Sequence, residues 1–137
     1  MILNLEELKA LLVLNRLGQR RHVVDMLVQG VCPGEVLECM AAERQGDPAR
    51  IEFDAEREIE KADRFGFRLL TWLDSDYPEN LRQIPGPPLV LYMAGAIESA
   101  DESALAIVGT RHPSFYGIEQ ARRFAMELAQ SGLTIIS

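Results

Sequence analysis

Gly109, Thr110 and Arg111 form the segment of the 137-residue sequence that is best suited to chemistry. Gly109 directly follows an unbroken apolar run, and a glycine at that point lets a ligand approach the backbone closely. Thr110 offers a hydroxyl group, and the guanidinium of Arg111 can donate two parallel hydrogen bonds to a phosphate. A turn of this composition predicts an anion site of the kind that α/β proteins place at strand ends.

The pattern of this turn alone leaves two interpretations open. It is neither G-x-G-x-x-G nor a P-loop, because the second glycines and the lysine are missing. In the plainer interpretation, Gly109 only makes a tight turn and Arg111 is a solvated surface charge. Composition and family likeness have to decide between them.

A second basic segment surrounds Leu17–Gly18, where Arg16, Arg20 and Arg21 flank the glycine. Such a turn between two helices could be a helix-hairpin-helix contact to DNA. A plain helical hairpin is favoured, because glycine turns of this kind are common and the surrounding residues are acidic.

The remaining reactive or aromatic residues favour structural roles. His22 and His112 have no partner constellation and are expected at the surface, while the aromatic side chains in or beside strands are expected in the core more than stacked on bases. These aromatic residues are Trp72, Tyr77 and Tyr92.

Cys32 and Cys39 lie seven positions apart on what is expected to be one helix, too far apart for a disulfide. They are interpreted as reduced core thiols. No metal-ligand spacing is present, so neither a metal nor a cofactor is expected.

Composition limits where a nucleic acid could bind. The net charge is −7 and 47% of the residues are hydrophobic, which fits a globular protein whose surface is not generally basic. Any nucleic-acid site must therefore be local. No apolar run is long enough for a membrane helix and the start lacks the features of a signal peptide, so a cytoplasmic protein without membrane contact is expected.

Helical periodicity covers residues 1–65. Asn4 and Glu7 have capping-box spacing ahead of a helix that runs to about Arg16. Three more helices are expected: one ending at Gln29–Gly30, one from Pro33 to Gln45–Gly46, and a charged one from Asp47–Pro48 to Phe65–Gly66.

After residue 66 the pattern changes to strands. Residues 67–72 and 89–93 are expected as strands around a helical turn at 77–81. Residues 105–108, 118–130 and 133–136 then predict a β-α-β unit whose strands are buried on both faces of a parallel sheet. The sequence therefore predicts an α/β protein with domains at 1–65 and 66–137.

Three segments in this order resemble the DprA/Smf family: YPENLRQIPGPPLVLYMAG, AIVGTRHPSFYG and SGLTIIS. The resemblance implies an N-terminal helical SAM-like or helix-hairpin-helix-like domain, followed by the truncated start of a Rossmann-like sheet. It also implies binding of single-stranded DNA, loading of RecA during natural transformation, a homodimer of the full-length protein, and no enzymatic activity.

The family's G-[ST]-R motif falls on Gly109, Thr110 and Arg111, which the resemblance implies would hold DNA phosphate. Ser137 would open the family's second glycine-rich phosphate loop, whose remaining residues are absent here. Three further positions match the turn that follows the first motif and are expected to shape it: Pro113, Tyr116 and Gly117.

Two other functions stay open from the sequence. One is a nucleotide-binding enzyme similar to the cytokinin-activating phosphoribohydrolases, which would need an acid or nucleophile beside the turn, and none is evident. The other is a protein-interaction module formed by the helical half.

Overall fold

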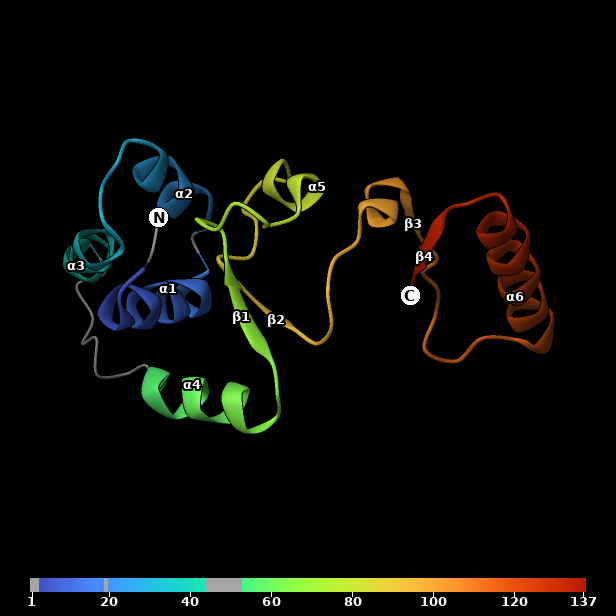
Figure 1. The fold of residues 1–137 in the computed structure, drawn as a ribbon, viewed down its shortest axis with the longest axis horizontal. Helices are drawn as coiled ribbons and strands as arrows, with labels where there is room; N and C mark the ends of the chain where they lie inside the picture. Colours follow the sequence, from blue (N-terminus) through green and yellow to red (C-terminus); the bar gives the residue numbers. More distant parts are fainter. Residues whose placement is uncertain (1–2, 19, 44–52) are drawn as a thin grey trace. The chain divides into compact units, whose positions relative to one another are not determined.

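The chain divides into two compact units, Met1–Gly95 and Ala96–Ser137 (Figure 1). The computed structural model describes residues 3–18, 20–43 and 53–137. Each unit contains helices and its own two-stranded sheet, so the mixed α/β class predicted from the sequence is confirmed. The SAM-like and Rossmann-like assignments stay predictions.

Helix α1 spans Leu5–Leu17 and begins as the sequence predicts. The side chain of Asn4 accepts a hydrogen bond from the Glu7 amide, and the Glu7 carboxylate accepts one from the Asn4 amide, both at 2.9 Å. These two bonds satisfy amides that the first turn of a helix leaves free. Gly18 ends the helix with φ 87°, a left-handed conformation that favours glycine.

Three further helices complete the helical part of the first unit: α2 (Arg20–Val28), α3 (Pro33–Glu43) and α4 (Ala55–Arg64). Asp54 caps α4 by accepting a hydrogen bond from the Arg57 amide at 3.0 Å. The helix ends predicted at Gln45–Gly46 and Asp47–Pro48 lie outside the described residues, but the prediction that the charged helix already covers residues 53 and 54 is wrong, since Asp54 is extended and α4 begins at Ala55.

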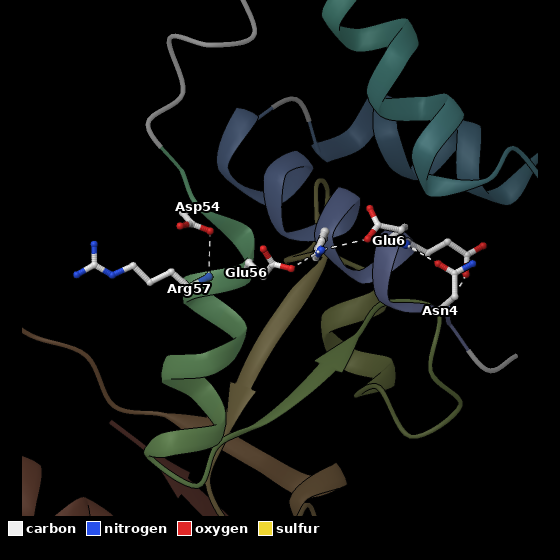
Figure 2. Close-up of polar contacts among 7 residues, drawn as sticks. Asn4, Glu6, Asp54, Glu56 and Arg57 are labelled. Carbon is white, nitrogen blue, oxygen red and sulfur yellow. Dashed lines mark hydrogen bonds and ion pairs between the residues drawn. The ribbon is translucent and has the colours of Figure 1, made fainter.

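Lys9 links α1 to α4. Its Nζ donates to Glu6 at 3.0 Å and to Glu56 of α4 at 2.8 Å (Figure 2). The hydrogen bond to Glu56, with a smaller one to Glu6, raises the pKa of Lys9 above its usual value. The ion pair with Glu56 therefore joins the two helices while Lys9 is charged, whereas the pair with Glu6 lies within α1.

Strands β1 (Arg68–Thr71) and β2 (Val90–Met93) pair antiparallel, with Leu70 opposite Leu91, and the short helix α5 (Glu79–Arg82) lies between them in sequence. Both strands belong to the first unit. The core of this unit joins α1, α2 and α3 to β2 and the residue before it through the following side chains: Leu11, Leu12, Leu14, Val23, Val36, Met40, Leu89 and Val90.

The division between the units at Gly95 comes later than the boundary at residue 65 that periodicity suggests. Leu89 and Val90 are 0% and 3% exposed, so the strand region uses the helices as its hydrophobic partner. The change from helical to strand periodicity marks a change of secondary structure inside one core.

The aromatic residues of this region differ in burial. Tyr77 is buried and its hydroxyl donates to the Pro88 carbonyl at 2.8 Å, as expected of a core residue. Trp72 is half-buried against the core. Tyr92 is 42% exposed, so the expectation of a core position is wrong for it.

The expectation of buried thiols is also wrong, because Cys32 and Cys39 are both exposed. Cys32 precedes α3, and its amide donates to the Glu35 carboxylate at 3.3 Å. In α3 the fully buried side chains are Val36 and Met40, one helical turn apart. Cys39 occupies a different face of the helix.

The second unit contains η2 (Ser99–Ser103), β3 (Ala104–Ala106), α6 (Phe115–Gln130) and β4 (Thr134–Ile136). β3 and β4 are adjacent and parallel, and α6 connects them in the sequence, so the predicted β-α-β unit is confirmed (Figure 1). The predicted burial on both faces is wrong, since Leu105 is 40% and Ile136 54% exposed. One helix cannot cover both faces of a sheet.

Among the described residues, no helix is long and apolar enough to cross a membrane. The same residues contain no group of three or more His, Cys, Asp or Glu side chains placed to hold a metal ion.

Candidate nucleic-acid interface

The carboxyl ends of β3 and β4 bring the predicted site residues to one edge of the sheet. Ala106 pairs with Ile136, and the Ile107 amide donates to the Ile136 carbonyl at 2.8 Å. Gly109 follows the end of β3 and Ser137 follows the end of β4. Because the strands are parallel and adjacent, both residues lie at the same edge, where α/β proteins place ligands.

Gly109 faces open space. A Cβ built on it would meet no atom within 4 Å, and its φ lies outside the left-handed region. The chain conformation therefore does not itself require a glycine here. The small residue instead leaves the backbone accessible to an incoming group.

Thr110 organises the turn. Its Oγ1 accepts a hydrogen bond from the His112 amide at 3.3 Å, a local bond that Thr makes readily in turns. The hydroxyl proton remains able to donate to an anion. His112 is exposed, as the sequence predicts.

Arg111 is exposed, and no hydrogen bond or ion pair joins its side chain to any other described residue. An arginine held in an internal salt bridge would have its charge neutralised inside the protein. This guanidinium is instead open to an external anion, with five donors in a planar arrangement.

The beginning of α6 adds to the positive character of the turn. Ser114 caps the helix by accepting from the Gly117 amide at 3.2 Å, and the first turn of the helix contains no acidic residue. Residues 104–118 include Arg111 and no Asp or Glu, in a chain of net charge −7. The amino end of a helix also carries partial positive charge. This segment is therefore locally attractive to anions.

Two exposed aromatic rings follow directly. Phe115 is 80% and Tyr116 72% exposed, at the first two positions of α6. The family resemblance implies a loop-shaping role for Tyr116 and gives no role to Phe115. The pattern that could have identified them is an aromatic pair immediately after a helix-capping serine, since buried side chains are uncommon at such a position.

Comparison with known proteins gives a family match that spans this site. Residues 68–137 match the family described as DNA recombination-mediator protein A. Protein Smf of Synechocystis sp. is 39% identical over 74 residues, which cover 51% of this chain and 19% of that protein. Protein Smf of Borreliella burgdorferi is 36% identical over 61 residues, covering 44% of this chain and 19% of that protein. The matched region thus spans about a fifth of these relatives. No solved structure matches the chain.

Proposed function

Because the chain belongs to the DNA recombination-mediator protein A family, we propose that it binds single-stranded DNA through the turn at Gly109, Thr110 and Arg111. The DNA backbone is the ligand, and the bound strand is handed to recombination. On the same premise, RecA and a second copy are the proposed partners of the whole protein, acting in natural transformation.

The observation that carries the proposal is the free Arg111 side chain. It is exposed and unpaired among the described residues, and it lies two residues from a glycine whose surroundings are open. A phosphodiester can accept two hydrogen bonds from the guanidinium and approach the backbone at Gly109. Thr110 supplies a third donor, and Ser137 is the proposed additional contact at the end of β4.

Phe115 and Tyr116 support a single-stranded ligand. Their rings are exposed beside the turn, and unpaired bases stack on exposed aromatic rings without sequence preference. In a duplex the bases are already stacked on one another, so these rings would gain little from it.

The test is binding of a fluorescein-labelled dT20 strand to the full chain, followed by anisotropy at several salt concentrations. Arg111→Ala is expected to raise Kd roughly tenfold and to reduce the slope of log K against log salt by about 1, because one phosphate contact is lost. Arg122→Ala is the matched control, since it removes an exposed arginine of α6 away from the turn.

Equal affinity of the Arg111→Ala variant and the unchanged chain would remove the turn as the site. Equal affinity for the labelled strand and its duplex would contradict the preference for single strands. The hydrolase alternative has no support from the geometry, because residues 104–118 contain no carboxylate that could act as an acid.

A further inference from the structure

An open cleft lies at the turn between α1 and α2, within the first unit. Its volume is about 520 Å³, and it is shallow and open to solvent. Seven residues line it: Gly18, Arg20, Arg21, His22, Asp25, Pro85 and Gly86. It belongs to a different unit from the turn at residues 109–111.

Two glycines shape this cleft. Gly18 ends α1 with φ 87°, and α2 begins at Arg20. Gly86 has φ 71°, and a Cβ added to it would be in ordinary van der Waals contact, 3.5 Å from the Arg20 Cβ and 3.6 Å from the Arg21 amide nitrogen. The loop at Pro85–Gly86 therefore lies against the start of α2 and forms a second wall.

The charge in the cleft is only partly neutralised. Arg21 is exposed and has no hydrogen bond or ion pair with any described residue. One terminal nitrogen of Arg20 donates to the Asn15 carbonyl at 3.3 Å, while its buried Nε has no partner. Asp25 is the one acidic residue among those lining the cleft. Two arginines against one carboxylate leave a net positive site in an acidic chain.

We propose that this cleft binds the phosphodiester backbone of a nucleic acid, as a second contact surface. The cleft is too open to enclose a small molecule on all sides, but a polymer can lie across it. The lining includes no Phe, Tyr or Trp for base stacking, so the contact is to phosphate and independent of sequence. The inference takes its ligand class from the proposed function, and its surface is separate.

The folded unit shows two features of the turn between α1 and α2 that the sequence alone does not. In the sequence, the acidic residues around the turn favour a plain hairpin. In the folded unit, however, Arg21 pairs with none of the described acidic side chains, and a loop more than sixty residues later in the chain closes one side of the turn. The turn therefore presents a guanidinium that is unpaired among the described residues, beside an opening that is bounded on two sides.

The experiment is a titration of the ¹⁵N-labelled full chain followed by amide NMR spectra. One arm adds a dT12 oligonucleotide and the other adds inorganic phosphate. The amides of Gly18 and Gly86 report on the cleft, and the amide of Gly109 reports on the proposed site in the other unit. We expect saturable shifts of Gly18 and Gly86 with dT12 at concentrations where phosphate alone causes none.

The outcomes separate the two proposals. Shifts at Gly109 without shifts at Gly18 and Gly86 would overturn this inference and leave the proposed function standing. Shifts confined to Gly18 and Gly86 would support the inference and count against the proposed function. Saturable shifts of the cleft with phosphate but not with dT12 would make it a free-anion site and overturn the nucleic-acid assignment.

A charge reversal tests the arginine directly. Arg21→Glu is expected to weaken the dT12-dependent shifts of Gly18 and Gly86 at least fivefold. Arg57→Glu is the control, because Arg57 is exposed and extends away from the neighbouring helices (Figure 2). This substitution changes the net charge by the same amount as Arg21→Glu. If the charge reversal disturbs the fold, Arg21→Gln tests the same residue by removing its charge only. Equal effects of the Arg21 and Arg57 substitutions on the dT12-dependent shifts would contradict the inference.

Discussion

The side-chain oxygen of Asn15 accepts a hydrogen bond from the backbone amide of Leu89 at 3.0 Å, across 74 residues of sequence. Asn15 lies in the last turns of α1, and Leu89 directly precedes β2 with its side chain fully buried. The same pair of segments forms part of the core. The hydrogen bond therefore fixes the position of the two-stranded sheet on the helices.

Replacing Asn15 by alanine leaves the Leu89 amide without this partner. Unfolding of the Asn15→Ala variant is expected to require about 1–3 kcal/mol less free energy, the usual cost of an unsatisfied buried donor. Urea unfolding followed by fluorescence of Trp72, the one tryptophan in the sequence, measures it. Gln29→Ala at an exposed position is the control, and an equal effect of the two changes would show that the bond adds nothing.

Arg82 holds the segment between the two strands. It donates to the carbonyls of Trp72 and Asp74, and its guanidinium lies 5.1 Å from the Trp72 ring centroid and 5.2 Å from that of Tyr77. Lysine keeps the charge but has no planar fork, so Arg82→Lys is expected to cost about 1–2 kcal/mol of unfolding free energy and to shift Trp72 emission.

The control for Arg82 is Glu79→Gln. That substitution removes the ion pair in which Arg82 Nε and Glu79 are 3.4 Å apart and affects an exposed hydrogen bond from the Gln83 side chain to Glu79, so it is expected to cost about 0.5 kcal/mol or less. If Arg82→Lys lowers the unfolding free energy no more than Glu79→Gln does, the contacts of Arg82 with the carbonyls and rings do not contribute to stability.

Tyr92 is expected to lose its phenol proton only at high pH. Burial of part of the side chain raises its pKa to about 12, and the negative charge of Glu58 and a hydrogen bond to it act in the same direction, while Arg16 lowers it. Since the folded state holds the phenol proton more tightly, this contribution to stability is complete below pH 10 and is lost as the pH rises from 10 to 12.

Absorbance at 295 nm follows this ionisation, and Tyr92→Phe identifies the step that belongs to Tyr92. Glu58→Gln is expected to lower the pKa of Tyr92 but to leave it above 10, because the burial remains. Glu60→Gln on the same helix is the control. An unchanged Tyr92 step in the Glu58 variant would contradict the proposed cause.

Local signals predicted the elements well. The spacing of Asn4 and Glu7 predicted the start of α1, and Gly18 predicted its end. The apolar runs near residues 105 and 134 predicted the two parallel strands. Each of these depends on neighbours within a few residues, where backbone hydrogen bonding and turn chemistry dominate. The turn and Ser137 could be placed at one edge because parallel strands fix which ends lie together.

Tertiary partners could not be predicted in the same way. That Leu89 packs on α1 depends on a contact over 74 residues, which periodicity does not encode. Whether Cys39 is exposed depends on which face of α3 packs against the core. The cleft at Gly18 needs Gly86, and nothing in either local sequence points to the other.

The exposed thiols give a direct chemical test. Cys32 and Cys39 are accessible in the folded chain, so both are expected to react with an aromatic disulfide reagent at similar, fast rates without denaturant. Cys32→Ser and Cys39→Ser each remove one equivalent. If the thiols react only after urea is added, they are buried in solution, as the sequence predicts.

The second unit exposes large apolar side chains along α6, including Phe115, Phe124 and Met126. Exposed apolar surface and open strand edges favour association, so the chain is expected to show sedimentation coefficients that rise with concentration. Phe124→Glu, at a position 49% exposed, is expected to shift the population toward monomer because it places a charge on this surface. Gln130→Glu adds the same charge at an exposed position at the end of α6 and is expected to leave the distribution unchanged. A monomer at every concentration, with no response to either substitution, would show that these side chains do not drive association.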